Sequence, residues 1–302
     1  MDAPRGVIGA CLTPFGQDGV VDGRALEREI AFMAGHCDGV SLFGAEASEY
    51  RLLSDAERRR WLGHAIKASK AAYRRVPVLA GVSSPQLREV AELSELAAEA
   101  GADLAQVLIP RRPWGPEATK AELVGYFEAV VRMSPLPVFA YHNPSAGSDV
   151  SIDVAVELCR IDGVVGYKES SRDMTKIGRL IAEIDHAGHA SYFTTMQPML
   201  ATVLQGGSGA MMPVPATVLG ARLMAAFRAG DLDTARTVQG LFARFPSRWA
   251  HYGLTPVMKS ALRHLGIDAG SCGAGFATVT AEDDAAIGAF LTDVGVAGVP
   301  TG

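Results

Sequence analysis

The sequence predicts an α/β protein whose strands close into a (β/α)8 TIM barrel with a C-terminal helical extension. Three observations carry this prediction. Short apolar runs alternate with longer amphipathic stretches through most of the 302 residues, which is typical of a parallel sheet with helical crossovers. Eight such units fit in about 230 residues, which favours a closed barrel over an open sheet. No GxGxxG motif follows an early strand, which counts against a dinucleotide-binding fold.

The predicted strands are short, apolar and bounded by turn-forming residues. In chain order they cover residues 7–14, 40–43, 76–82, 104–109, 138–141, 164–168, 192–195 and 209–214. The helices between them show apolar residues at helical spacing, as at Leu26, Ile30 and Met33. Ser54 and Glu57 form a capping box that opens the second helix, and Gly101 closes the third.

The remaining barrel helices are predicted over residues 24–36, 86–100, 120–133, 152–160, 175–184, 199–204 and 217–228. Beyond Gly230 the strand–helix alternation stops, and residues 232–245, 256–266 and 281–291 are predicted to be helical. We therefore expect a catalytic barrel over residues 1–230. The extension, residues 231–302, should pack on it, since no linker-like segment separates the two.

Composition narrows the class of protein. The net charge is −5 and no Lys/Arg-rich stripe occurs, so nucleic acid is not an expected partner. No apolar run reaches the roughly 20 residues of a membrane span, and the N-terminus lacks a signal-peptide pattern, so we expect a cytoplasmic protein. The four cysteines and seven histidines show no metal-binding spacing, so free thiols and no metal are expected.

Chemistry is expected where the strands end, because the active site of this fold lies at the carboxyl ends of the strands. Lys168 ends the sixth strand. A lysine amine in an apolar pocket loses its charge readily and can then form an imine with a carbonyl group. The alternative is a lysine that reaches solvent or pairs with an acid such as Glu169.

Tyr141 ends the fifth strand, which should neighbour the sixth. A phenol beside an imine-forming lysine could carry protons to and from the carbinolamine. A tyrosine that only packs at the barrel rim is the alternative.

Two further loops offer substrate-binding groups. The segment after the second strand is Gly44-Ala45-Glu46-Ala47-Ser48-Glu49. Its small residues would let backbone N–H groups approach a carboxylate, and its two acids could instead be structural. After the fourth strand, Arg111 and Arg112 could bind an anionic substrate group, or lie in solvent or at a subunit interface.

The chain resembles the dihydrodipicolinate synthase / N-acetylneuraminate lyase superfamily over nearly its whole length. The matching motifs are Leu12-Thr13-Pro14-Phe15, Asp18-Gly19 with Asp22, Tyr141 with Pro144, Lys168-Glu169-Ser170, Gly206-Gly207-Ser208-Gly209 and Pro256-Val257-Met258-Lys259. The resemblance implies that Lys168 forms the Schiff base and that no other cofactor is needed. It also implies a 2-oxo acid substrate such as pyruvate, and a homotetramer or homodimer. Gly209 and Met211 of the eighth strand join the candidate substrate-binding residues.

The departures from the family pattern are informative. The family's carboxylate-binding Gly-Thr-Thr-Gly-Glu or Gly-Ser-Thr-Gly-Glu segment is one residue longer here, and only Ser48 of its hydroxyl pair remains. Dihydrodipicolinate synthases place an arginine where this chain has Ala146, and Tyr141 alone remains of their proton relay. We therefore do not expect a typical dihydrodipicolinate synthase acting in lysine biosynthesis.

The sequence indicates three candidate functions, of which the first is favoured. The first is a class I aldolase-type lyase that cleaves or forms a carbon–carbon bond of a 2-oxo acid. The second is a 2-keto-3-deoxy sugar-acid dehydratase that uses the same imine, with Glu46 or Glu49 as general base. The third is a non-catalytic barrel with a binding or regulatory role. The retained Tyr141 and Lys168 count against the third, because a structural barrel does not need a buried lysine.

Overall fold

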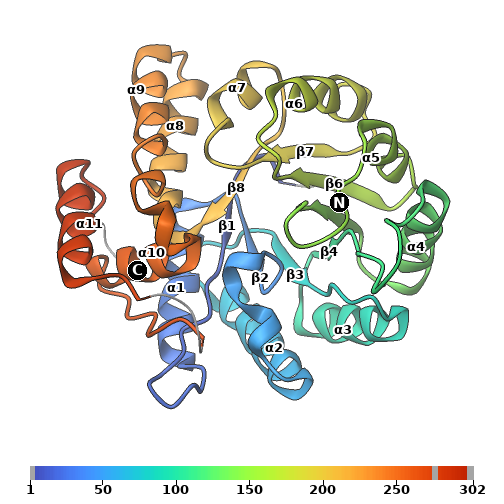
Figure 1. Ribbon diagram of the computed structural model, residues 1–302, viewed down its shortest axis with the longest axis horizontal. Coiled ribbons are helices and arrows are strands. Elements are labelled where there is room, and N and C mark those ends of the chain that lie inside the picture. The colour runs from blue at the N-terminus through green and yellow to red at the C-terminus, as the bar shows by residue number, and fades with distance from the viewer. Residues whose placement is uncertain (1–3, 274–277, 298–302) are drawn as a thin grey trace.

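The computed structural model describes residues 4–273 and 278–297 (Figure 1). Its strands are parallel and form one closed barrel, in which each strand pairs with its sequence neighbours and β8 pairs with β1. The strands are β1 Gly6–Ala10, β2 Gly39–Leu42, β3 Val78–Gly81, β4 Leu104–Leu108, β5 Val138–His142, β6 Val164–Glu169, β7 Ser191–Thr194 and β8 Gly209–Pro213. The predicted fold class is confirmed.

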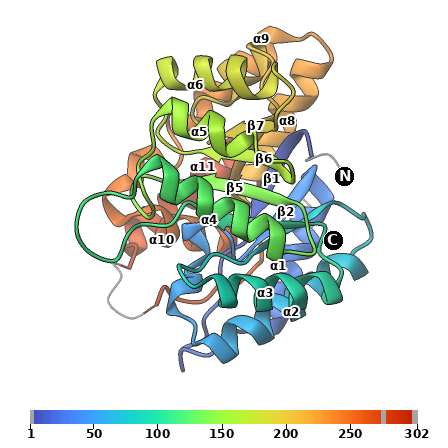
Figure 2. The same cartoon turned by 90° about the vertical axis from the view of Figure 1, so that its right-hand side faces the viewer.

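Eight helices surround this ring, and Figure 2 shows α2 to α6 stacked in chain order on its outer side. They are α1 Gly23–His36, α2 Asp55–Ala71, α3 Leu87–Ala100, α4 Lys120–Met133, α5 Ile152–Cys159, α6 Met174–Leu180, α7 Met199–Leu204 and α8 Thr217–Arg228. Shorter helical turns are η1 Glu46–Ser48, η2 Tyr50–Leu52, η3 Ile181–Asp185, η4 Val214–Ala216 and η5 Ser247–Tyr252.

Local signals read from the sequence explain several boundaries. The Ser54–Glu57 capping box is present at the start of α2, and Gly101 ends α3 in the left-handed conformation with φ 100°. Several predicted elements differ in extent from the observed ones. The first strand stops at Ala10 because the chain then turns, and Phe15 pairs with Val21 outside the barrel. The sixth helix is regular only to Leu180 and continues as a π-helical turn.

The core has two parts. The larger lies between the barrel and its helices, and the smaller fills the inside of the barrel. Strand alternation separates the two sides, so that Phe139 and Phe193 point inward while Tyr167 packs against the helices. Val165 departs from the predicted alternation and packs against the inner cluster, because the β5–β6 register shifts beside it.

Three helices follow the barrel and appear in orange and red in Figure 1: α9 Leu232–Phe242, α10 Leu254–His264 and α11 Ala281–Asp293. Helix α9 packs on α8, and α11 packs on α10. Helix α10 also contacts η1 and η4, which follow β2 and β8. The extension therefore reaches the end of the barrel at which the strands finish.

Two findings concern only the parts of the chain that the structure describes. Within residues 4–273 and 278–297 no helix has the length and apolar character of a membrane span, and no group of three or more His, Cys, Asp or Glu is arranged to hold a metal ion. All four cysteines are unpaired; Cys11, Cys37 and Cys159 are buried and Cys272 is half-buried.

Candidate active site

A cavity of about 440 Å³ opens at the carboxyl ends of the strands, where the fold predicts the active site. Ala10, Ala45 and Met211 contribute apolar atoms to it, and Tyr141 and Lys168 lie on its wall. The size suits a small-molecule substrate.

Lys168 and Tyr141 are brought together by strand pairing. They occupy paired positions on β6 and β5, and alternation turns both side chains into the barrel. The Lys168 Nζ lies 4.4 Å from the centre of the Tyr141 ring and donates a hydrogen bond to Ser170 Oγ at 2.5 Å. The Tyr141 hydroxyl in turn accepts a hydrogen bond of 3.0 Å from the Asn143 side chain.

Burial sets the charge states of this pair. Lys168 is 6% exposed, and desolvation lowers the pKa of its amine to about 7; Glu169 opposes this shift and Arg172 adds to it. Burial, with the charge of Glu46, raises the pKa of Tyr141 to about 12. At neutral pH the site therefore holds a lysine with an appreciable neutral fraction beside a protonated phenol.

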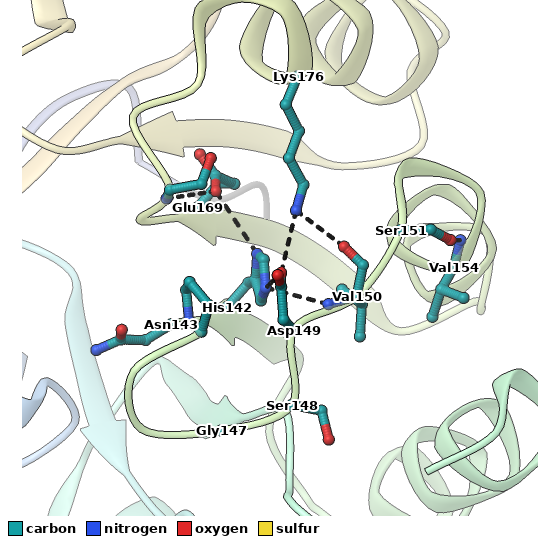
Figure 3. A network of polar contacts seen from close by, with 12 residues as sticks. His142, Asn143, Gly147, Ser148, Asp149, Val150, Ser151, Val154, Glu169 and Lys176 are labelled. Carbon is teal, nitrogen blue, oxygen red and sulfur yellow. Dashed lines mark hydrogen bonds and ion pairs between the residues drawn. The ribbon is translucent and has the colours of Figure 1, made fainter. Parts of the chain in front are cut away.

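The next residue on each strand points the other way and forms a polar network behind the barrel wall (Figure 3). His142 Nδ1 lies 3.6 Å from Glu169, both side chains are fully buried, and the Ser171 N–H donates to the Glu169 carboxylate at 2.5 Å. Burial acts to raise the pKa of Glu169, but the nearby His142 ring and the hydrogen bonding of Ser171 outweigh it and lower the pKa. Glu169 is thus held as a carboxylate on the face opposite Lys168.

This network continues to the surface. His142 Nε2 lies 3.2 Å from Asp149, and Lys176 of α6 contacts Asp149 at 3.4 Å and the Val150 carbonyl at 2.9 Å (Figure 3). These contacts tie the segment after β5 to the start of α6. They therefore help to fix the ends of the two strands that carry Tyr141 and Lys168.

The loop after β2 divides into two parts. Ala45, Glu46 and Ala47 line the cavity, so they remain candidates for substrate binding. The Glu46 carboxylate is held by Arg51 at 3.0 Å and by the Tyr50 hydroxyl at 3.2 Å.

The other three loop residues are not among those that line the cavity, and their contacts are with other parts of the protein. A side chain at Gly44 would collide with Gln106, which supports the loop from inside the barrel through a 3.1 Å hydrogen bond to the Gly44 carbonyl. Ser48 is buried and its hydroxyl donates to the Ala45 carbonyl at 2.6 Å. Glu49 is also buried, and it pairs with Lys259 of α10 at 2.6 Å.

Two more candidates lie away from the cavity. Arg112 pairs with Glu122 at the start of α4 instead of facing the substrate. Gly209 begins β8, and because a strand starts at the opposite end of the barrel from the active site, it packs against Gly6.

Arg111 donates to the backbone carbonyls of Pro144 and Gly147. Met211 is the candidate from this group that lines the cavity.

Sequence reasoning did not assign a site role to several polar residues of the cavity wall, among them Ser170, Arg172, Thr195 and Gln197. Thr195 and Gln197 follow β7, which has the weakest strand pattern, and each has a buried oxygen without a hydrogen-bond partner in the described residues. Ser170 and Arg172 follow Lys168 directly. The rule that active sites lie on loops after strands would have identified both.

These features define a class of enzyme. A (β/α)8 barrel with a desolvated lysine beside a phenol at the strand ends has the arrangement of a class I aldolase-type lyase, which works through a lysine imine. Comparison with known proteins is more specific: residues 3–294 match the model of the Dihydrodipicolinate synthetase family, and the chain belongs to this family. It is a lyase, and the resemblance found in the sequence is confirmed.

Relatives cover the whole chain. A 4-hydroxy-tetrahydrodipicolinate synthase of Methanococcoides burtonii is 29% identical over 307 residues, which cover 96% of this chain and 98% of the relative. YagE, a prophage protein of the dihydrodipicolinic acid synthase family from E. coli K12 solved with pyruvate, aligns with a TM-score of 0.85 at 25% identity, covering 97% of this chain and 99% of its own. N-acetylneuraminate lyase from Mycoplasma synoviae shares the fold, with a TM-score of 0.80, 22% identity and coverage of 96% and 97%.

Proposed function

We propose that Lys168 forms an imine with a 2-oxo acid such as pyruvate, and that the enzyme uses this imine to cleave or form a carbon–carbon bond. The observation that carries the proposal is the buried Lys168 amine, whose pKa is lowered to about 7 at the wall of the cavity. An unshifted lysine with a pKa of 10.5 would be neutral in only about 0.03% of molecules at pH 7. Burial raises that fraction to about one half.

The proposed reaction has three stages: imine formation, carbon–carbon bond cleavage and product release. The neutral Nζ attacks the 2-oxo carbon, and the carbinolamine loses water to give an iminium ion. In cleavage of a 4-hydroxy-2-oxo acid, the C4 hydroxyl loses its proton, the C3–C4 bond breaks, and its electron pair enters the iminium to give an enamine and an aldehyde. Protonation of C3 and addition of water then release pyruvate and the free amine. The reverse sequence forms the bond.

Tyr141 and Ser170 are the groups placed to move these protons. The Tyr141 phenol stays protonated at neutral pH, since its pKa is about 12, so it can donate to the departing hydroxyl of the carbinolamine and then recover a proton. The Ser170 hydroxyl contacts the Lys168 Nζ and extends this path. Backbone groups of Ala45, Glu46 and Ala47, which line the same cavity, are the candidates for binding the C1 carboxylate.

The wider setting follows from the family. We infer that the enzyme is a homotetramer or homodimer, acts in the cytoplasm, and requires no cofactor beyond the lysine itself. Ala146 offers no cation to a second substrate, so we infer that this substrate differs from that of the synthases at 29% identity.

Dehydration is the second candidate, and Glu46 supports it. Glu46 lines the cavity, so it is the acid placed to act as a base toward C3 of an imine while a hydroxyl leaves C4. Glu49 is removed from this role by its buried pair with Lys259. A dehydratase would convert a 2-keto-3-deoxy sugar acid without releasing an aldehyde, so product analysis by mass spectrometry separates the two reactions.

Reductive trapping tests the proposal. The protein is incubated with pyruvate and cyanoborohydride, and intact and peptide masses are measured. We expect a stable adduct on Lys168 and none in Lys168→Met, whereas Lys67→Met, which changes an exposed lysine of α2, should be labelled as the wild type is. Absence of an adduct from pyruvate and from a panel of other 2-oxo acids would contradict the proposal.

A further inference from the structure

Arg172 has an unusual backbone conformation. Its φ is 62°, in the left-handed region that residues with a side chain rarely adopt. Phe43 and Glu49 are the other such residues in the described chain that are not glycine, and all three lie in segments that follow β2 or β6 at the mouth of the barrel. Strained residues of this kind persist where the surrounding structure holds them, often at ligand-binding sites.

The side chain of Arg172 lines the active-site cavity. It is exposed, and no hydrogen bond or ion pair to it occurs among residues 4–273 and 278–297. The arginines first considered for substrate binding differ from it, because Arg111 is engaged by backbone carbonyls and Arg112 by Glu122. The acid of the cavity wall, Glu46, already has Arg51 as its partner.

We propose that Arg172 binds a second carboxylate of the substrate, at the end of the molecule remote from the Lys168 imine. Its guanidinium can hold a carboxylate through two parallel hydrogen bonds. The enzyme then prefers a 2-oxo acid chain that ends in a second carboxylate over a neutral chain of similar length. This inference rests on the proposed imine at Lys168 and adds the substrate class.

The polarity of the cavity agrees with this assignment. Ala10, Ala45 and Met211 belong to the inner core cluster and line the same cavity as Lys168, and their apolar atoms suit the short carbon chain of a bound 2-oxo acid. The loops after β6 and β7 add Ser171, Arg172 and Gln197, whose polar groups suit a longer, oxygen-bearing chain. A substrate attached at Lys168 and extended toward these loops meets Arg172, which is the cationic residue other than Lys168 in the described lining of the cavity.

Imine trapping measures this preference without a turnover assay. Cyanoborohydride adducts are quantified over a range of 2-oxoglutarate and 2-oxoadipate, which carry a second carboxylate, and of 2-oxopentanoate and 2-oxohexanoate, which do not. We expect the better dicarboxylate to reach half-maximal trapping at about ten- to hundredfold lower concentration than the neutral chains. Arg172→Gln should abolish this ratio, and Arg172→Lys should restore part of it.

Two controls make the outcomes distinct. Arg179→Gln removes the same charge from α6, where Arg179 pairs with Glu183 outside the cavity, and should keep the wild-type ratio. Pyruvate should trap with similar half-saturation in wild type and Arg179→Gln at pH 9, where the Lys168 amine is neutral. Arg172→Gln should still form the pyruvate adduct on Lys168, which shows that its site is folded. A wild-type ratio near one, or an unchanged ratio in Arg172→Gln, overturns the role of Arg172. Loss of pyruvate trapping in the wild type overturns the imine itself.

Discussion

Two lysines of this barrel are almost fully buried, and their surroundings make them different chemical groups. Lys168 at the end of β6 contacts the Ser170 hydroxyl and the face of Tyr141. Lys259 of α10 contacts the Glu49 carboxylate at 2.6 Å and the Ser271 carbonyl at 2.6 Å. Lys259 is a partner in an ion pair. Among the described residues Lys168 has only a neutral hydroxyl within hydrogen-bonding reach, so it can give up its proton.

Lys168 also has an acid beside it, but only in the sequence. Glu169 is the next residue, but strand alternation turns it to the outer face of the sheet, where His142 holds it. The acid therefore acts on the lysine only through the strand and not by direct contact. A buried lysine becomes a nucleophile when the nearest carboxylate is on the other side of the strand. It forms a structural ion pair when the carboxylate is in direct contact.

The largest expected effect comes from removing Lys168. Lys168→Met should lower turnover by about 10⁴-fold or more, because no other group can form the imine. The same variant should be more stable than the wild type by about 2 to 4 kcal/mol at pH 8, since it no longer buries an amine that the unfolded chain would protonate. Denaturant titration measures the second effect, and a loss of stability would refute this account of the site.

Lys259→Met should have the opposite effects on stability and on pyruvate trapping. It leaves the Glu49 carboxylate buried without its partner, so we expect a loss of about 3 to 5 kcal/mol in the free energy of unfolding. Pyruvate trapping at low temperature should continue on Lys168. In the double variant Lys259→Met/Glu49→Leu most of the stability should return, because an apolar pair needs no counter-charge. If the double variant is as unstable as Lys259→Met, the ion pair is not the cause.

The pH dependence of trapping reports the charge of Lys168 directly. The neutral amine reacts and its pKa is lowered to about 7, so the rate of adduct formation with pyruvate should rise about tenfold per unit below pH 7 and level off above about pH 8. The stability of the folded protein should also increase with pH. The free energy of unfolding should increase with pH from about 7 to 10.5, because there the unfolded chain binds the extra proton. A midpoint near 10 in the trapping profile would mean that burial does not discharge the lysine.

Two substitutions should move that midpoint in opposite directions. Glu169 raises the pKa of Lys168 and Arg172 lowers it. Trapping by Glu169→Gln should therefore have its midpoint at lower pH than the wild type, and trapping by Arg172→Gln at higher pH. Shifts of the same sign in both variants would point to a general change in the site instead of the loss of one charge.

The smallest expected effect concerns backbone strain at the cavity mouth. Arg172→Gly should raise the free energy of unfolding by about 1 kcal/mol, because glycine adopts a φ of 62° without a steric cost. Thermal unfolding compared with Arg172→Ala, which keeps the strain and also loses the guanidinium, isolates the backbone contribution. Equal stabilities of the two variants would show that the position is relaxed.

The loop after β2 has features that the sequence predicted and others that it could not. Its position at the strand end was predicted, and Ala45 to Ala47 do line the cavity. The sequence could not tell Glu46 from Glu49, since both are acids of one short loop. Packing decides the difference. Arg51, a near neighbour in the sequence, binds Glu46, whereas Lys259, 210 positions after Glu49, pairs with that acid in the interior.

The sequence by itself determined the barrel, the pairing of Tyr141 with Lys168 and the family, because hydrophobic periodicity, helix caps and strand order are local properties of the chain. Only the tertiary structure decided that Gly44, Ser48, Glu49, Arg112 and Gly209 support the site or lie away from it, and that Arg172 faces the cavity. The physical reason is that exposure and charge pairing depend on which residues of other elements pack nearby, and these contacts form only when the ring of strands closes.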